Sequence, residues 1–149
     1  MDNFVVTITR SCGSGGSIIA NLLAKQLNIK VYDKELLKLA SDDSGINERL
    51  FAMVDEDTKK SILYKVSKRV YNGELIPPES NDFTSNDNLF NYQAKVLKEL
   101  AKENSYIVIG RGADYVLRDN KNVIKIFVHA NNEECILREM KRLGMERKE

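Results

Sequence analysis

The sequence predicts an α/β domain in which helices cover both faces of a central parallel sheet. Short apolar runs alternate with segments of helical periodicity along most of the chain. The run Ser105–Ile109 is apolar almost throughout, which is typical of a parallel strand that is buried on both faces. A glycine-rich turn joins the first apolar run to the first helical pattern. Together these three observations predict the α/β class.

The elements of the first half follow from periodicity and from capping residues. Asp33 stands directly after a short apolar run and is expected to cap the helix that follows it. The first half is predicted to contain strand 4–9, helix 18–27, strand 29–32, helix 34–40, a turn at 41–45 and one long helix or two over about 47–71.

Residues 72–88 carry the weakest structural signal. This segment contains Pro77 and Pro78 and a polar run that ends at Asn88. A loop of this length in a compact domain is usually mobile or functional. Two interpretations therefore stay open, a disordered surface insertion or an element that closes over a substrate.

The second half returns to a regular alternation of strands and helices. It is predicted to contain helix 89–102, strand 105–109, a short helix 113–117, strand 123–128 and a last helix 133–143, which Asn132 is expected to cap. The final residues, 145–149, are mostly charged and carry no capping signal. Such an ending is typical of a fragment or of a chain whose tail is disordered.

The composition predicts one soluble domain with no affinity for nucleic acid or membranes. The chain has 149 residues, enough for one hydrophobic core, and a formal net charge of +1, so no overall field attracts such partners. No apolar run approaches the ~18 residues of a membrane span, and no signal-peptide pattern precedes the first strand. Cys12 and Cys135 have no metal-binding spacing, and the single histidine, His129, excludes a site with several histidines. A reducing cytoplasm is therefore expected.

The strongest functional signal is the glycine turn, which we define as residues 11–17. It lies between a predicted strand and a predicted helix, an order that places backbone N–H groups and a helix N-terminus around an anion. Compared with the phosphate-binding pattern G-x-x-x-x-G-K-[ST], Gly15 takes the place of the second glycine and Ser17 that of the Mg²⁺ ligand. The turn is therefore predicted to hold phosphate. The alternatives are a plain tight turn and a dinucleotide loop, and Ile18 at the third glycine's position disfavours the latter.

The glycine turn lacks the lysine of that pattern. Arg10 stands where the first glycine is expected, and Gly16 stands where the lysine is expected. A charge-assisted hydrogen bond contributes about 1.5–3 kcal/mol, and a donor aimed at developing charge can be worth about 10²–10³ in rate. Arg10 is the nearest candidate for a replacement cation, with a surface ion pair as its alternative role. Cys12 is better explained as a small turn residue than as a thiol activated by the helix N-terminus.

A second functional signal is Gly110–Gly112, which we call the arginine turn. It follows a predicted buried strand, and in open parallel sheets ligands bind beyond the carboxyl ends of the strands. Its Arg111 is predicted to bind a phosphate through paired hydrogen bonds, with the bridging of loop carbonyls as the alternative. Asp33 could orient a substrate or a metal-bound water, or it could only cap its helix. Asp114 could reach the same site.

These segments together resemble the cytidylate kinase-like family within the nucleoside monophosphate kinases. The resemblance spans nearly the whole chain and rests on the opening strand with the glycine turn, the pair Tyr32–Asp33, the strand that leads into Arg111, and residues 123–138. It implies a three-layer α/β/α P-loop domain over residues 1–149, in which about 41–88 form a monophosphate-binding insertion. It also implies a lid and one more strand, which would follow Glu149.

The resemblance implies that ATP donates the phosphate and that Mg²⁺ is held at Ser17. The donor phosphates would lie on the glycine turn, at Cys12, Gly13, Ser14, Gly15, Gly16 and Ser17. The acceptor would contact Arg111, with Asp33 and Asp114 on the substrate side. Arg10 and Arg111 are the catalytic candidates.

The chain departs from authentic cytidylate kinases in two places. Gly16 replaces their lysine, and the arginine turn lacks the acids that flank their arginine. The expected reaction is transfer of the ATP γ-phosphate to CMP, dCMP or a related small acceptor. A nucleotide-binding module of the same fold without catalysis is the alternative, which the missing lysine favours. The acceptor and the oligomeric state stay open.

Overall fold

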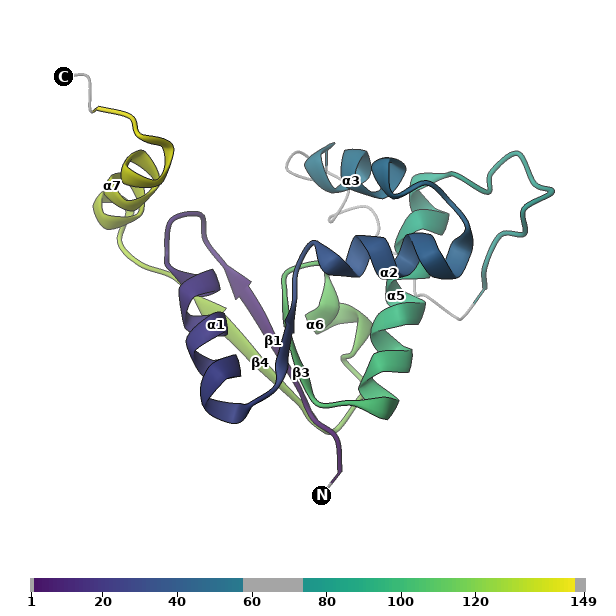
Figure 1. Cartoon of the computed structure of the whole chain (residues 1–149), viewed down its shortest axis with the longest axis horizontal. Coiled ribbons are helices and arrows are strands. Elements are labelled where there is room, and N and C mark those ends of the chain that lie inside the picture. The colour runs from purple at the N-terminus through teal and green to yellow at the C-terminus, as the bar shows by residue number, and fades with distance from the viewer. Residues whose placement is uncertain (1, 58–73, 147–149) are drawn as a thin grey trace.

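A computed structural model of the chain describes residues 2–57 and 74–146. They form a four-stranded parallel sheet with helices on both sides, so the predicted α/β class is confirmed (Figure 1). The strands lie in the order β2-β3-β1-β4, where β1 is Val5–Arg10, β2 is Lys30–Tyr32, β3 is Tyr106–Ile109 and β4 is Val123–Val128. Because all strands run the same way, their carboxyl ends meet at one edge of the sheet.

The helices divide between the two faces of the sheet. They are α1 (Gly16–Leu27), α2 (Glu35–Ser44), α3 (Glu48–Asp57), α5 (Asn86–Glu103), α6 (Ala113–Val116) and α7 (Asn132–Leu143). α1 packs on one face, and α2, α5 and α6 pack on the other (Figure 1). α7 stands at the carboxyl edge, beside the turn between β1 and α1. None of the described helices is long and apolar enough to cross a lipid bilayer.

The face under α1 has a thin core because α1 meets the sheet through small side chains. Ala20 is fully buried and Ala24 is nearly so, and both pack with Val6 and Ile8 of β1. Small residues let the helix approach the sheet closely. The first turn of α1 is thereby held near the carboxyl end of β1.

The opposite face carries the larger core, which includes the fully buried ring of Tyr106. This ring meets the ring of Tyr32 edge to face, with 5.4 Å between centroids. Its hydroxyl donates a 2.7 Å hydrogen bond to the carbonyl of Leu97 on α5, which offsets the penalty for burying a polar group. Burial raises the pKa of Tyr106 well above its ordinary value. These contacts fix α5 against β3, the strand that leads into the arginine turn.

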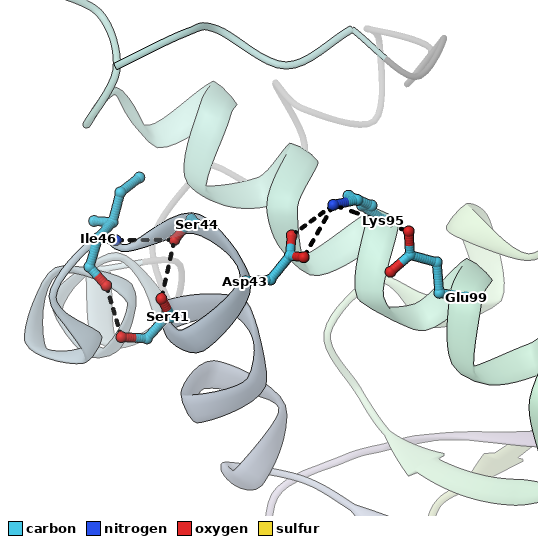
Figure 2. Close-up of polar contacts among 6 residues, drawn as sticks. All are labelled: Ser41, Asp43, Ser44, Ile46, Lys95 and Glu99. Carbon is cyan, nitrogen blue, oxygen red and sulfur yellow. Dashed lines mark hydrogen bonds and ion pairs between the residues drawn. The ribbon is translucent and has the colours of Figure 1, made fainter.

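An ion pair joins α2 to α5 (Figure 2). The Nζ atom of Lys95 lies 3.0 and 2.9 Å from the two carboxylate oxygens of Asp43 and 3.9 Å from Glu99. The hydrogen bond to Asp43 is the main reason that the pKa of Lys95 is raised. The Lys95 and Asp43 side chains are 31% and 28% exposed, so the pair stabilises the contact by about 0.2–1 kcal/mol. Buried apolar side chains of α2, such as Leu36, contribute more.

The end of α2 corrects one prediction. Residues 41–44, predicted as part of a turn, continue the helix, which ends at Gly45 in the left-handed conformation with φ 74°. The Ser41 hydroxyl donates to the carbonyl of Ile46 at 2.6 Å, and the N–H of Ile46 donates to the Ser44 hydroxyl at 3.1 Å (Figure 2). The serines that suggested a turn therefore close the helix end instead of interrupting the helix.

One buried side chain ties the segment before α5 to the body of the domain. Asn88 is fully buried, and its Nδ2 donates to the carbonyls of Ile76 at 3.2 Å and Phe83 at 2.7 Å. Its Oδ1 accepts the N–H of Ile76 at 2.9 Å, and Leu75 and Phe83 pack against the core. The interpretation as a disordered insertion is therefore wrong for residues 74–85. A role in closing over a substrate stays a prediction.

The N-caps of α2 and α7 each lie one residue away from the predicted position. Lys34 is the N-cap of α2, and Asp33 makes no cap bond; the carboxylate of Glu35 instead accepts the N–H of Asp33 at 3.2 Å. Asn131, and not Asn132, caps α7 with its side chain. The two adjacent asparagines have the same capping ability, so spacing alone does not distinguish them, and α2 begins without a side-chain cap.

Two predicted helices have different limits in the structure. α5 starts at residue 86, where Ser85 caps it, and not at residue 89. The long helical stretch predicted over 47–71 is confirmed as α3 for residues 48–57. The rest of that prediction lies outside the described residues.

Helices flank the sheet as predicted, but β4 is less covered than β1 and β3. This strand is at one edge of the sheet, and the side chains of Ile124 and Phe127 are 56% and 64% exposed. The outer side of α1 is also apolar, with Ile18 and Leu22 exposed. The prediction holds for β1 and β3, whose central residues are buried.

Candidate functional site

The glycine turn links β1 to α1 through two glycines in the left-handed region. Gly13 has φ 75°, and Gly15, the N-cap of α1, has φ 88°. The N–H of Ser11 donates to the carbonyl of Val128 at 3.0 Å, and that of Ser14 donates to Ser11 at 3.2 Å. Within the described part of the chain, no hydrogen bond to a residue outside α1 takes the N–H groups of Cys12, Gly13, Gly15, Gly16 and Ser17. Such a run of amides at a helix start is suited to an anion.

Gly13 is also the point where α7 presses against the turn. A Cβ atom at Gly13 would collide with the carbonyl oxygen of Cys135 and lie 2.8 Å from its carbonyl carbon. Cys135 is buried, and its thiol donates to the carbonyl of Ala130 at 3.6 Å. Since both the left-handed backbone and this contact exclude a side chain, glycine is required at position 13.

Arg138 of α7 reaches over the same turn. Its Nη1 donates a 2.6 Å hydrogen bond to the carbonyl of Gly13, and a Cβ atom at Gly15 would lie 3.4 Å from that nitrogen. Sequence reasoning did not select Arg138 as a site residue. Its position follows from the pairing of β4 with β1, which the structure shows. A helix that follows a strand next to β1 starts beside the turn that follows β1.

Arg10 is the last residue of β1, and its exposed side chain lies between the two turns. A Cβ atom at Gly16 would lie 2.7 Å from the Cβ of Arg10, and one at Gly110 would lie 3.1 Å from its Nη1. The stem of Arg10 therefore runs over the start of α1, and its guanidinium reaches the arginine turn. The structure thus brings this predicted cation beside both segments that the sequence singled out.

The arginine turn has three consecutive residues in the left-handed region. Gly110, Arg111 and Gly112 have φ angles of 66°, 62° and 62°, and a non-glycine residue there is strained by about 1–3 kcal/mol. The side chain of Arg111 is 5% exposed and its Nη2 lies 3.1 Å from Oδ1 of Asp33, whose side chain is 38% exposed. The structure therefore joins two predicted site residues, with the carboxylate as the more accessible partner.

The carboxylate of Glu35 is part of the surroundings of this pair. Hydrogen bonds from the backbone N–H groups of Glu35 itself and of Asp33 lower the pKa of Glu35 below its ordinary value, and Lys30 and Arg111 add a smaller attraction. The carboxylate of Glu35 thus holds the backbone N–H of Asp33 at the start of α2.

The other predicted residues lie at the same edge without forming one contact network. Asp114 is in the first turn of the four-residue helix α6, and no hydrogen bond or ion pair among the described residues joins it to Arg111 or Asp33. Cys12 is exposed with a free thiol, Ser14 is buried, and Ser17 is exposed in the first turn of α1.

The described residues contain no group of three or more His, Cys, Asp or Glu side chains arranged to hold a metal ion. Mg²⁺ is commonly bound by one or two protein oxygens together with substrate phosphates and waters. Ser17, which is exposed at the start of α1, could supply one such oxygen.

The parallel sheet flanked by helices defines the class of the protein as an α/β domain, and the sequence family gives that domain its kinase-like character. The chain belongs to the cytidylate kinase-like family, whose sequence profile matches residues 5–149. The resemblance inferred from the sequence is therefore confirmed. A comparison with the curated protein sequences finds no match.

A solved structure supports the fold. This chain is similar to the crystal structure of an uncharacterized protein from Eubacterium ventriosum, with a TM-score of 0.63 and 23% sequence identity. The match covers 97% of this chain and 64% of that one, so the present chain corresponds to less than two thirds of that protein.

Proposed function

We propose that this protein transfers the γ-phosphate of ATP to CMP, dCMP or a related small acceptor. One observation carries the proposal: the glycine turn and the arginine turn follow neighbouring parallel strands at the same edge of the sheet. β1 pairs with β3, and the N–H of Gly110 donates to the carbonyl of Ile8 at 3.0 Å. Two anion-binding segments this close suit a reaction in which a phosphoryl group passes from one phosphate to another.

The glycine turn is the proposed donor side. The amides of residues 12–17 would hold the ATP phosphates, and Ser17 would ligate Mg²⁺. Arg10 and Arg138 both lie against this turn. They supply positive charge that the turn itself lacks, because glycine occupies position 16.

The arginine turn is the proposed acceptor side. Arg111 would bind the acceptor phosphate, with Asp33 orienting both the guanidinium and the acceptor, and Asp114 nearby on α6. The insertion predicted over about 41–88 is proposed for the same side, because α2, which leads into it, begins two residues after Asp33. A preformed pair between Arg111 and Asp33 suits this role because it needs no reorganisation when the acceptor binds.

Catalysis at such a site consists of positioning and charge neutralisation. Phosphoryl transfer asks for an in-line arrangement of donor and acceptor and for cations near the oxygens that carry the charge. We place the protein in the cytoplasm, where nucleotides are available and free thiols such as those of Cys12 and Cys135 persist. With a net charge of +1, we expect neither nucleic acid nor a membrane as a partner.

The test is ADP formation by the purified full-length protein with ATP and Mg²⁺. Nucleoside monophosphates are added one at a time, with CMP and dCMP first. We expect stimulation of ADP release by at least one of them above the rate with ATP alone. If none of them stimulates release, the kinase assignment is wrong.

A nucleotide-binding module without catalysis is the second candidate, and Gly16 is the observation that favours it. Calorimetry separates the two when it is combined with the turnover assay. Binding of ADP or ATP together with no stimulated turnover would support the module. Turnover with any monophosphate would reject it.

A further inference from the structure

We infer that Arg10 is a single cation shared by the donor and acceptor phosphates, and that Gly16 is a glycine because the Arg10 side chain needs its space. This inference rests on the proposed function, since it assigns a cation to both proposed phosphate sites. It goes further in joining the two turns through one side chain.

The first observation is the path of the Arg10 side chain across α1. A Cβ atom at Gly16 would lie 2.7, 3.1 and 3.2 Å from the Cβ, Cγ and Cδ atoms of Arg10. The stem of Arg10 therefore occupies the volume through which a residue 16 side chain would leave the helix. Arg10 and a lysine at position 16 exclude each other in this conformation.

The second observation is that the backbone does not explain the glycine at position 16. Gly16 is absent from the glycines of positive φ, which include Gly13 and Gly15. It lies inside the first turn of α1, where any L residue has an allowed conformation and where glycine is less favourable than alanine. The space taken by Arg10 gives a direct physical reason for glycine there.

The third observation is the far end of the side chain. A Cβ atom at Gly110 would lie 3.1 Å from Nη1 of Arg10, so the guanidinium rests against the first residue of the arginine turn. The next residue is Arg111, the proposed acceptor ligand. The aliphatic stem of Arg10 thus lies beside the glycine turn, and its guanidinium lies beside the arginine turn.

The fourth observation is that the guanidinium has open hydrogen-bonding capacity. Arg111 is paired with Asp33, and Arg138 is bonded to a carbonyl. Arg10 is exposed, and within residues 2–57 and 74–146 no hydrogen bond or ion pair engages its guanidinium. Its N–H groups are available to a ligand, in a region where the proposed function places two phosphates.

A guanidinium suits this shared position better than an ammonium. Its five N–H donors lie in one plane and point in different directions, so it can bond to two phosphate groups at once. A lysine ammonium acts as a compact point charge on a flexible stem. In transfer between two phosphates, a cation between them also faces the oxygens that carry the developing charge.

The test measures binding of the two sides separately, without turnover. ADP with Mg²⁺ probes the donor side, and the nucleoside monophosphate that binds wild type most tightly probes the acceptor side, each by calorimetry. Arg10→Met keeps the aliphatic stem over Gly16 and removes the charge. We expect this variant to lower the affinity for both ligands by about tenfold. Lys25→Met, an exposed lysine in the last turn of α1, removes the same charge and should change neither affinity.

The exchange variant R10G/G16K sharpens the test, because it removes Arg10 and places a lysine on α1. We expect it to recover ADP affinity relative to Arg10→Met and to leave monophosphate affinity weakened, since a lysine on α1 serves the donor side. Recovery of the affinity for both ligands would contradict the sharing of one cation. Recovery of neither affinity, in a variant whose circular dichroism matches wild type, would contradict it as well.

The outcomes separate this inference from the proposed function. If wild type binds neither ADP nor any monophosphate, the proposed function fails, and the inference fails with it. If wild type binds both and Arg10→Met binds both equally well, the inference alone is wrong. If Arg10→Met binds ADP more weakly and the monophosphate as well as wild type does, Arg10 is a donor-side cation only. That result would contradict the inference that it serves both phosphates.

Discussion

The two turns at the carboxyl edge of the sheet present charge in opposite ways. The glycine turn offers backbone amides, and its cations, Arg10 and Arg138, are exposed side chains that come from outside it. The arginine turn carries its own cation, which is 95% buried and paired with Asp33. Under the proposed function, we therefore expect the donor side to adjust when its ligand binds and the acceptor side to be formed beforehand.

The largest effect is expected at the contact between the glycine turn and α7. Gly13→Ala would force a left-handed alanine against the carbonyl of Cys135, and we expect the free energy of unfolding to fall by about 3 kcal/mol. Gly45 has almost the same φ and nothing within 4 Å of a Cβ atom. Gly45→Ala should therefore lower it by about 1 kcal/mol. Equal losses in urea unfolding would show that α7 does not constrain the turn.

The next effect concerns the preformed charge pair of the arginine turn. Asp33→Asn removes the carboxylate charge that lies 3.1 Å from the buried guanidinium of Arg111, and we expect a loss of about 1–2 kcal/mol, discounted because Asp33 is partly exposed. Asp43→Asn breaks the more exposed pair with Lys95 and should cost about 0.5 kcal/mol. Urea unfolding of both variants measures this difference. A larger loss for Asp43→Asn would remove the distinction between the two regions.

A smaller change is expected at the exposed cation of the glycine turn. Arg138→Met removes the bond to the carbonyl of Gly13, and we expect ADP affinity to fall about tenfold, or about 1.4 kcal/mol. Lys141→Met in the last turn of the same helix should leave ADP affinity unchanged. Calorimetry with ADP and Mg²⁺ decides between a ligand-binding role and a purely structural one. Unchanged affinity in Arg138→Met would mean that this arginine only holds the turn.

The smallest effect is a pH dependence at Glu35. Its folded-state pKa is lowered, so its contribution to stability is present above its ordinary pKa of 4.5 and is lost as pH falls through the lower folded value. We expect Glu35→Gln to cost up to about 0.5 kcal/mol at pH 7. Below pH 4.5 the difference from wild type should shrink. A difference that grows on acidification would contradict the direction of the shift.

The sequence was sufficient to predict the elements that have strong local signals. Apolar runs predicted all four strands of the described sheet, with β4 at its observed limits, because a strand in a parallel sheet is recognised from a short run of apolar residues. The turn predicted at 41–45 was wrong, since the serines there bond back to the helix end. The order of the strands is a long-range property that no local pattern carries.

The candidate site could be predicted in the same partial way. The glycine turn and Arg111 were visible because their residues are adjacent in the chain. Arg138 was missed because its contact with Gly13 spans 125 residues and depends on β4 lying beside β1. The relation between Arg10 and Gly16 was visible only as two departures from a pattern, and the structure shows that they are in contact.

The most direct test of the account is a crystal structure of the protein with ADP, Mg²⁺ and CMP. The account predicts that the β-phosphate of ADP lies within hydrogen-bond distance of the amides of residues 13–17. It also predicts that the CMP phosphate contacts Arg111, with Arg10 between the two. Nucleotides bound away from both turns, or a phosphate of neither ligand at the glycine turn, would contradict it.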